Sequence, residues 1–203
     1  MSVVHLIDTL TEWAQLNVCN NIKLKVPPEN TEANDAQYEY QTENPVAFPM
    51  YVPTSEKLPP TIHSPFPSLC VRFIEGEDTM ADRSGFVNVQ FCFSAWNPGR
   101  HGPDLLHPLG NNTFARAING KGEFQRNADG WRDVWNFVDI ALRAVESVTS
   151  IGDYTVDRTT PVKFGPLVEQ EAIADYYPFW FAWISFRVNY PLLRNNPNTE
   201  KFL

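Results

Sequence analysis

The feature that most constrains the fold is a long run near the C-terminus, residues 178–190, in which every second residue from Trp180 to Tyr190 is apolar. A strand places alternate side chains on opposite faces of a sheet. The intervening side chains are aromatic in the first half of the run and polar in the second: Phe179, Phe181, Trp183, Ser185, Arg187 and Asn189. We therefore expect a strand with one face buried throughout. The other face should be covered only over its first half, by a helix or by a neighbouring subunit.

An amphipathic helix is expected before this strand. Its apolar side chains recur at three- and four-residue steps, with Trp131 one turn earlier: Val134, Val138, Ala141, Leu142, Val145 and Val148. Asn127 or Asp129 can cap its start, and Gly152 lies just beyond its end. The pattern predicts a helix over 129–149 that packs on the strand 178–190. The residues expected to be buried between them are Val138, Leu142, Ile184 and Phe186.

The rest of the chain predicts an α+β fold. Apolar periodicity indicates a first helix over 2–18, and alternation indicates strands at 22–26, 154–157 and 162–167. Two further strands, 68–74 and 85–96, flank a polar turn and are expected to form an antiparallel hairpin. The prediction is a single domain over 1–203, with two helices packed on a mostly antiparallel sheet.

Two segments interrupt this pattern. Residues 27–67 hold nine of the 17 prolines and six acids against one base, so we expect an extended acidic arm with a short edge strand at 46–52. Residues 97–128 are rich in Gly, Pro and Asn, carry four bases against two acids, and are expected to be a long loop insertion. Irregular segments of this length are either mobile or held by a partner, and of the two we expect a partner.

The overall charge disfavours two classes of partner. A net charge of −8 repels nucleic-acid backbones and anionic lipid, so we expect neither specific nucleic-acid binding nor membrane association. Cys19, Cys70 and Cys92 are odd in number and widely spaced, which favours reduced, buried thiols. The start of the sequence has no basic leader and no apolar run approaches a membrane span, so a soluble protein that is not secreted is expected.

The candidate catalytic and metal-binding residues do not form a recognisable pattern. The four histidines are His5, His63, His101 and His107. His101 and His107 share a loop, but they lack metal-ligand spacing and a neighbouring carboxylate or Cys. Asp133 and Asp139 are too far apart around the helix to share a proton, and no nucleophile or phosphate-loop motif is present. We therefore expect no catalytic residue, no cofactor, no metal site and no enzyme activity.

The start of the second helix resembles a known family. The stretch 129–136 (Asp-Gly-Trp-Arg-Asp-Val-Trp-Asn) opens the helix, a short turn follows at 151–152, and the sequence Tyr-Pro-Phe-Trp at 177–180 leads into the final strand. These features, with the hairpin sequence 70–75 and the N-terminal helix, resemble the tail terminator (tail completion) family of tailed bacteriophages and phage-derived tail particles. The motif residues carried by the helix are Gly130, Trp131, Asp133 and Asn136. The segments 27–67 and 97–128 depart from the resemblance.

The resemblance implies a structural virion protein. Such a protein would close into a hexameric ring on the tail tube, stop its polymerisation and offer a docking surface to the head. The implied partners are further copies of the chain, the tail tube protein, the head–tail connector or neck protein, and the sheath protein if the tail contracts. The implied location is the neck end of the virion tail, with assembly in the host bacterial cytoplasm. The alternatives are a head-completion or neck protein, or a small cytoplasmic enzyme or ligand-binding protein with 97–128 as a lid.

The charges of the two irregular segments predict how a ring would assemble. An acidic arm of one subunit can lie against the basic loop of the next, which would steer assembly more than supply affinity. The apolar anchors expected in these segments are Phe48, Tyr51, Phe66 and Phe114. Reversing Arg116 and Lys121 to Glu should slow ring formation at low salt, and the difference should shrink as salt rises.

Overall fold

The computed structural model describes residues 3–27, 41–79, 81–82, 84–97, 106–110, 113–116, 130–174 and 176–191. The helices are α1 (Val3–Asn17) and α2 (Trp131–Ser147), with short 3-10 turns η1 (Cys19–Asn21) and η2 (Ser55–Lys57). The strands in the first half are β1 (Leu24–Lys25), β2 (Thr42–Glu43), β3 (Val46–Pro49), β4 (Ser68–Thr79) and β5 (Ser84–Trp96). The later strands are β6 (Leu106–Gly110), β7 (Thr113–Arg116), β8 (Ser150–Ile151), β9 (Tyr154–Val156), β10 (Lys163–Pro166), β11 (Val168–Glu169), β12 (Ala172–Ile173) and β13 (Phe179–Pro191).

The main sheet has seven strands in the order β3-β4-β5-β13-β9-β8, with β10 also pairing with β13. All pairs are antiparallel except β3 with β4, which is parallel. β5 and β13 pair along their whole length, from Trp96 opposite Phe179 to Ser84 opposite Pro191. The described residues thus form an α+β fold with a mostly antiparallel sheet, as the sequence predicts.

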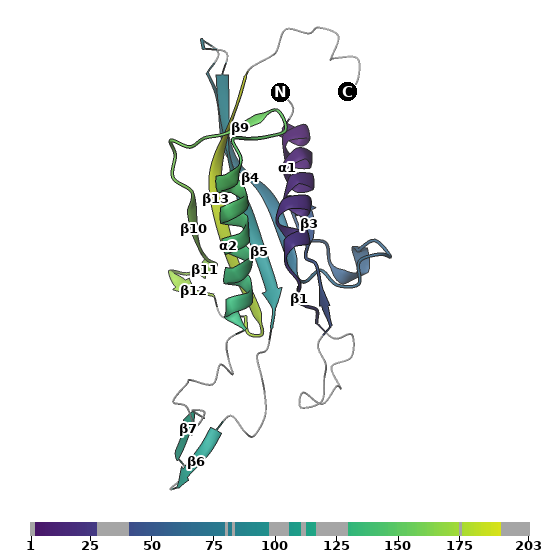
Figure 1. Ribbon diagram of the computed structural model, residues 1–203, viewed down its shortest axis with the longest axis vertical. Coiled ribbons are helices and arrows are strands. Elements are labelled where there is room, and N and C mark those ends of the chain that lie inside the picture. Colours follow the sequence, from purple (N-terminus) through teal and green to yellow (C-terminus); the bar gives the residue numbers. More distant parts are fainter. Residues whose placement is uncertain are drawn as a thin grey trace.

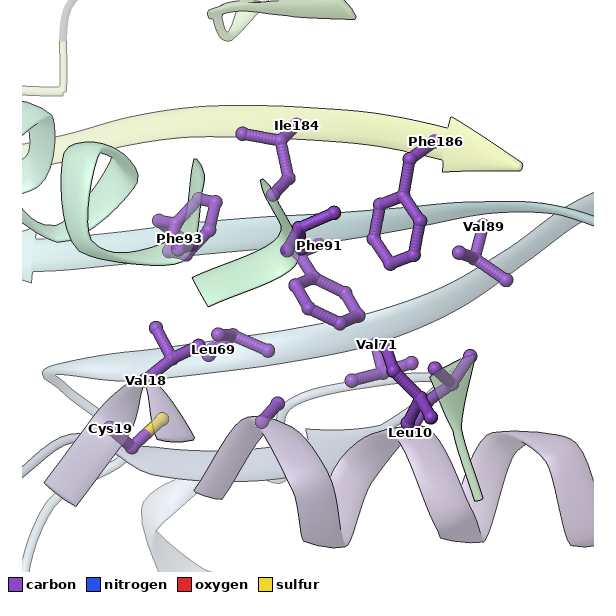
Figure 2. Packing of buried hydrophobic residues seen from close by; sticks show 14 of the residues in the cluster. Leu10, Val18, Cys19, Leu69, Val71, Val89, Phe91, Phe93, Ile184 and Phe186 are labelled. Atoms are coloured by element: carbon purple, nitrogen blue, oxygen red, sulfur yellow. The ribbon is translucent and has the colours of Figure 1, made fainter. Parts of the chain in front are cut away.

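Both helices lie along the strands on one side of the sheet (Figure 1). The core fills the space between the two layers and is built largely from alternate residues of β5 and β13, as Figure 2 shows for several of them. The Phe91 ring contacts Phe186 edge-on at 5.1 Å between centroids, and Phe93 contacts Phe137 of α2 at 4.9 Å. Tilted and edge-on contacts of this kind add to the stability gained from burying the rings.

The predicted faces of the final strand are confirmed. Its core-facing residues beyond Trp180 are all buried: Ala182, Ile184, Phe186, Val188 and Tyr190. On the opposite face Phe179 and Phe181 are half-buried, and both contact the ring of Phe66, at centroid distances of 4.9 and 6.3 Å. Within the chain these two rings are covered by a loop rather than by a helix.

The predicted helix is confirmed, but its buried face is rotated from the predicted one. Phe137, which the pattern did not select, is fully buried against Phe93, whereas Leu142 is only partly buried. Trp131 is 39% exposed and stacks with Arg132 instead of entering the core. Phe137 is buried because its ring packs edge-on against Phe93 of β5.

The predicted hairpin is longer than expected. The segment 75–79 was expected to be a turn, but it continues β4 and pairs with β5 down to Thr79 opposite Ser84. Its polar side chains are compatible with a strand because the hairpin extends past the ends of both helices (Figure 1), where water reaches both faces. The Tyr190 hydroxyl donates a hydrogen bond to Asp78 across this extension.

The predicted short edge strand at 46–52 is confirmed as β3, and the described residues 50–67 are irregular apart from η2, as expected. The expected irregularity is wrong at β2, β6 and β7. β2 pairs with β1, and β3 lies parallel to β4, so the described part of 27–67 is ordered by contacts within the chain. β6 and β7 pair with each other within 97–128. Residues 28–40, 98–105 and 117–129 lie outside the described residues.

Candidate functional site

The motif residues at the start of α2 form a joint with the end of β5. Asn97, the residue after β5, donates a hydrogen bond from Nδ2 to Asp133 Oδ2 at 2.7 Å. Its backbone N–H donates to the Pro178 carbonyl at 3.0 Å, and its own carbonyl accepts the Trp180 indole N–H at 2.9 Å. Asn97 is 7% exposed. The joint, which we define as Lys25, Asn97, Gly130, Asp133 and Trp180, therefore fixes α2 to the sheet.

Gly130 is required by this joint for space. A Cβ atom placed on it would lie 1.9 Å from the Asn97 carbonyl oxygen and 2.8 Å from the Trp180 indole nitrogen. Its backbone is in the ordinary helical region, at φ −55 and ψ −30, so conformation alone does not demand glycine. The close approach of the Asn97 backbone does. The glycine of the family-like motif thus has a structural explanation in this chain.

Charge is partly compensated inside the joint. Burial raises the pKa of the Asp133 carboxyl, while the Asn97 hydrogen bond and the positive charge of Lys25 act to lower it. Lys25 Nζ donates to Asn97 Oδ1 at 2.9 Å, so Asn97 bridges the cation and the carboxylate. This arrangement suits a positioning network.

The joint also brings together the roots of the two segments with opposite charge. Lys25 lies just before residues 28–40, and Asn97 and Gly130 bracket residues 98–129. The described residues next to the acidic segment and next to both ends of residues 98–129 therefore lie close together. Sequence reasoning did not anticipate this.

Among the residues that the structure describes, the side of the sheet that faces away from the helices is covered at only one end. Beyond the rings of Phe179 and Phe181 it carries two rows of polar side chains, which we call the open face: Arg72, Gln90, Ser185 and Lys163 in one row, and Glu75, Asn88 and Arg187 in the next. Arg72 and Lys163 are exposed, and the Arg187 guanidinium lies 3.9 Å above the centre of the Phe86 ring. Arginines beside aromatic rings are typical of protein interfaces.

The outer edge of β3 is capped by α1. Val46 and Met50 donate their N–H groups toward β4, so the N–H of Ala47 points away from it. That N–H donates to Gln15 Oε1 at 2.8 Å, and Gln15 Nε2 donates to the Pro45 carbonyl at 3.2 Å. Little of this edge is left for another strand.

The outer edge of β10 is capped in a similar way. The Trp183 side chain lies over Gly165 and donates its indole N–H to the Pro166 carbonyl at 3.0 Å. Pro166 itself has no N–H to offer. Beyond the end of β3, the outer edge of β4 has no neighbouring strand among the described residues. This part of β4 has a bulge at Ile74 and acidic side chains at Glu77 and Asp78. These edges do not favour assembly by adding strands.

The residues predicted to make contacts between subunits have different environments. Phe48 is 7% exposed and belongs to the interior of its own chain, so it is not available as an anchor. Phe66 is half-buried against β13, whereas Tyr51 is 66% exposed. Phe114 and Arg116 lie in β7, where only the backbone is described, and Lys121 lies outside the described residues. Asn136 of the motif is exposed on α2.

The described residues contain no group of three or more His, Cys, Asp or Glu residues placed to hold a metal. His5 and His63 are exposed, His101 lies outside the described residues, and His107 is described only in its backbone. Burial raises the pKa of all three thiols, that of Cys92 to about 11, which disfavours the reactive thiolate. Asp139 is exposed on α2, far around the helix from the joint.

A hollow of about 490 Å³ lies at the far end of the sheet, lined by Thr79, Ser84, Gly85, Phe86, Thr155, Asn189 and Tyr190. It is at the start of β5, whereas the segment 98–129 leaves from the end of β5 at Asn97. A strand of this length spans roughly 40 Å. The root of that segment is thus remote from the hollow, which does not favour a lid over it.

Comparison with models of known protein families finds no match, and comparison with curated proteins finds none either. Within the described part of the chain, neither helix has the length and apolar character needed to cross a lipid bilayer.

Proposed function

We propose that this chain is a structural protein that caps the end of a phage or phage-like tail tube as a ring. The ring stops the tube from growing and provides the surface to which the head or neck docks. The observation that carries the assembly role is the open face, where Arg72, Lys163 and Arg187 share one side of the sheet and Arg187 stacks on the Phe86 ring. The specific tail role rests on the resemblance of residues 129–136 to tail terminators.

Two features support assembly over chemistry. The motif residues Gly130 and Asp133 belong to the joint. Their contacts hold α2 against the end of β5, which is a structural role. The outer edges of β3 and β10 are capped by Gln15 and Trp183, which favours binding of a neighbour by side chains on a face of the sheet. Binding of this sheet face to a different surface of the next copy is compatible with a closed ring.

Two alternatives predict different outcomes. A head-completion or neck protein would have the same assembly surface but would bind on the head side of the head–tail connection. A small enzyme or ligand-binding protein would use the hollow beside Asn189 and Tyr190. The remoteness of this hollow from the root of residues 98–129 favours the assembly role.

Native mass spectrometry and electron microscopy test the proposal together. A ring of six 23.2-kDa chains without a bound small molecule is expected for the purified protein. The protein is expressed in the bacterium that makes the particles and is then labelled with gold. The label should appear at the neck end of isolated tails. Label on heads that lack tails would instead identify a neck protein. A monomer with a stoichiometric metal or cofactor, and no label on particles, would contradict the assembly role.

A further inference from the structure

We propose that the open face of one copy binds the outer side of α1 of the next copy, so that sheet and helix meet head to tail around the ring. The inference rests on the proposed ring and names the two surfaces that close it. The joint and the capped strand edges remain outside the interface.

The first row of the open face is positive on a negative protein: it carries the bases Arg72 and Lys163 and no acid, in a chain of net charge −8. The rows beyond it add Arg187 together with the acids Glu75, Asp157 and Glu77, which lie opposite Asn88, Arg187 and Phe86. Among the described residues, no carboxylate forms an ion pair with any of these three bases. The surface is therefore suited to an acidic partner.

Part of the open face is already ordered for binding. Arg187 stacks on Phe86, and its Nε donates to Asn88 Oδ1 at 3.1 Å. Asn88 in turn donates to Glu75 Oε1 at 2.8 Å, so the Glu75 carboxylate is already hydrogen-bonded. An arginine held in place before binding loses less conformational freedom in the complex.

The outer side of α1 has the complementary character. Asp8 and Glu12 are exposed there, and α1 contains no Lys or Arg. Val4 and Leu16 lie one turn beyond each acid along the helix and are 70% and 58% exposed. The helix thus presents an acidic centre flanked by apolar side chains, and the sheet presents basic residues beside aromatic ones.

The positions of the two surfaces favour a second copy of this chain as the occupant. α1 packs on one side of the sheet and the open face is on the other, so each copy carries both halves of the interface on opposite sides. Repeating such a contact produces a ring when the rotation between copies closes. Capping of β3 by Gln15 and of β10 by Trp183 disfavours the competing mode, strand addition.

A charge exchange tests the interface. The face variant carries Arg72→Glu and Lys163→Glu, and the helix variant carries Asp8→Lys and Glu12→Lys; all four side chains are exposed, so folding should be retained. A control variant, Lys57→Glu with Arg143→Glu, changes exposed bases away from the open face by the same charge. Assembly is followed by sedimentation velocity over a concentration series at low and high salt, after circular dichroism has checked each fold.

Each variant alone should need a concentration about ten-fold higher or more to assemble at low salt, and the control should behave as wild type. An equimolar mixture of the two variants should recover assembly, because each acidic face then meets a basic helix. If either variant assembles as readily as wild type, or if the mixture does not recover assembly, the proposed interface is wrong. The proposed ring is not contradicted by either result. If the wild-type protein stays monomeric at every concentration and no gold label is found on tails, the proposed function is wrong as well. Loss of binding to a short DNA duplex in the face variant, with unchanged self-association, would assign the open face to nucleic acid and overturn the proposal.

Discussion

Asn97 holds Asp133 through a single hydrogen bond of 2.7 Å, and this bond connects the end of the longest sheet pairing to the first turn of α2. The same asparagine accepts from Lys25, which lies 72 positions earlier in the chain. Three distant parts of the sequence are therefore held at one point.

Replacing Gly130 with alanine should strongly destabilise the fold, because the added Cβ would overlap the Asn97 carbonyl oxygen. We expect a loss of about 3 kcal/mol in the free energy of unfolding, measured by urea titration. The matched control is Asn136→Ala on the same helix, where the side chain is exposed and the change should stay within about 0.5 kcal/mol. Equal stability of the two variants would refute the close contact.

Asp133 should make stability depend on pH. Its pKa in the folded protein is raised, chiefly by burial, above the ordinary value of 3.8, so the fold binds a proton more tightly than the unfolded chain does. Wild type should therefore lose stability relative to Asp133→Asn as pH rises from 3.8 toward neutrality. Urea titrations of both proteins across this range measure the difference. A difference that grows in favour of wild type would mean that Lys25 outweighs the cost of burial.

The rotated face of α2 predicts an order among core substitutions. Phe137→Ala should cost about 3–5 kcal/mol and Ile184→Ala about 2–5 kcal/mol, because both side chains are fully buried. Leu142→Ala should cost less than either, since Leu142 is only partly buried. Urea titration of the three variants gives the order directly. A larger loss for Leu142→Ala than for Phe137→Ala would place the core on the other side of the helix.

Removing the cap on β3 should expose a strand edge. In Gln15→Ala the N–H of Ala47 loses its acceptor, and the carbonyl of Pro45 loses its donor. Faster, concentration-dependent aggregation is expected by light scattering. Gln41→Ala is the control, because the Gln41 side chain is exposed next to β2 and does not cap β3. Aggregation of both variants at the same rate would show that the loss of Gln15 acts in another way.

The parts of the fold that sequence patterns predict are those whose side chains report their own surroundings. Alternation in β5 and β13 identifies their buried faces because each long strand has one face on the core. The burial of Phe137 does not follow from α2 alone, because α2 is apolar over a wide arc and the space beside Phe93 decides which residues enter. The polar end of β4 is held in place by pairing with β5 and not by burial of its side chains. Its side chains therefore show no buried face, and the sequence predicts a turn there.

The joint and the edge caps depend on contacts between residues far apart in the sequence. Lys25 and Asn97 read as ordinary polar residues near the ends of strands, and Gln15 as an exposed helix position. The motif drew attention to Gly130 and Asp133, but it did not indicate which residues they contact. Such contacts require the fold to be known.

The direct contact between Asn97 and Gly130 has a consequence for how this chain can change over evolution. Asn97 and Gly130, which flank residues 98–129, are in contact. A change in the number of residues between them therefore need not alter the rest of the domain. With the ends already together, doubling the length of such a segment costs only about 0.6 kcal/mol of closure entropy. Insertions and deletions can therefore accumulate there while the helices and the sheet stay in register. A lineage could exchange this whole segment as the shape of its binding partner diverged, and keep the same domain beneath it.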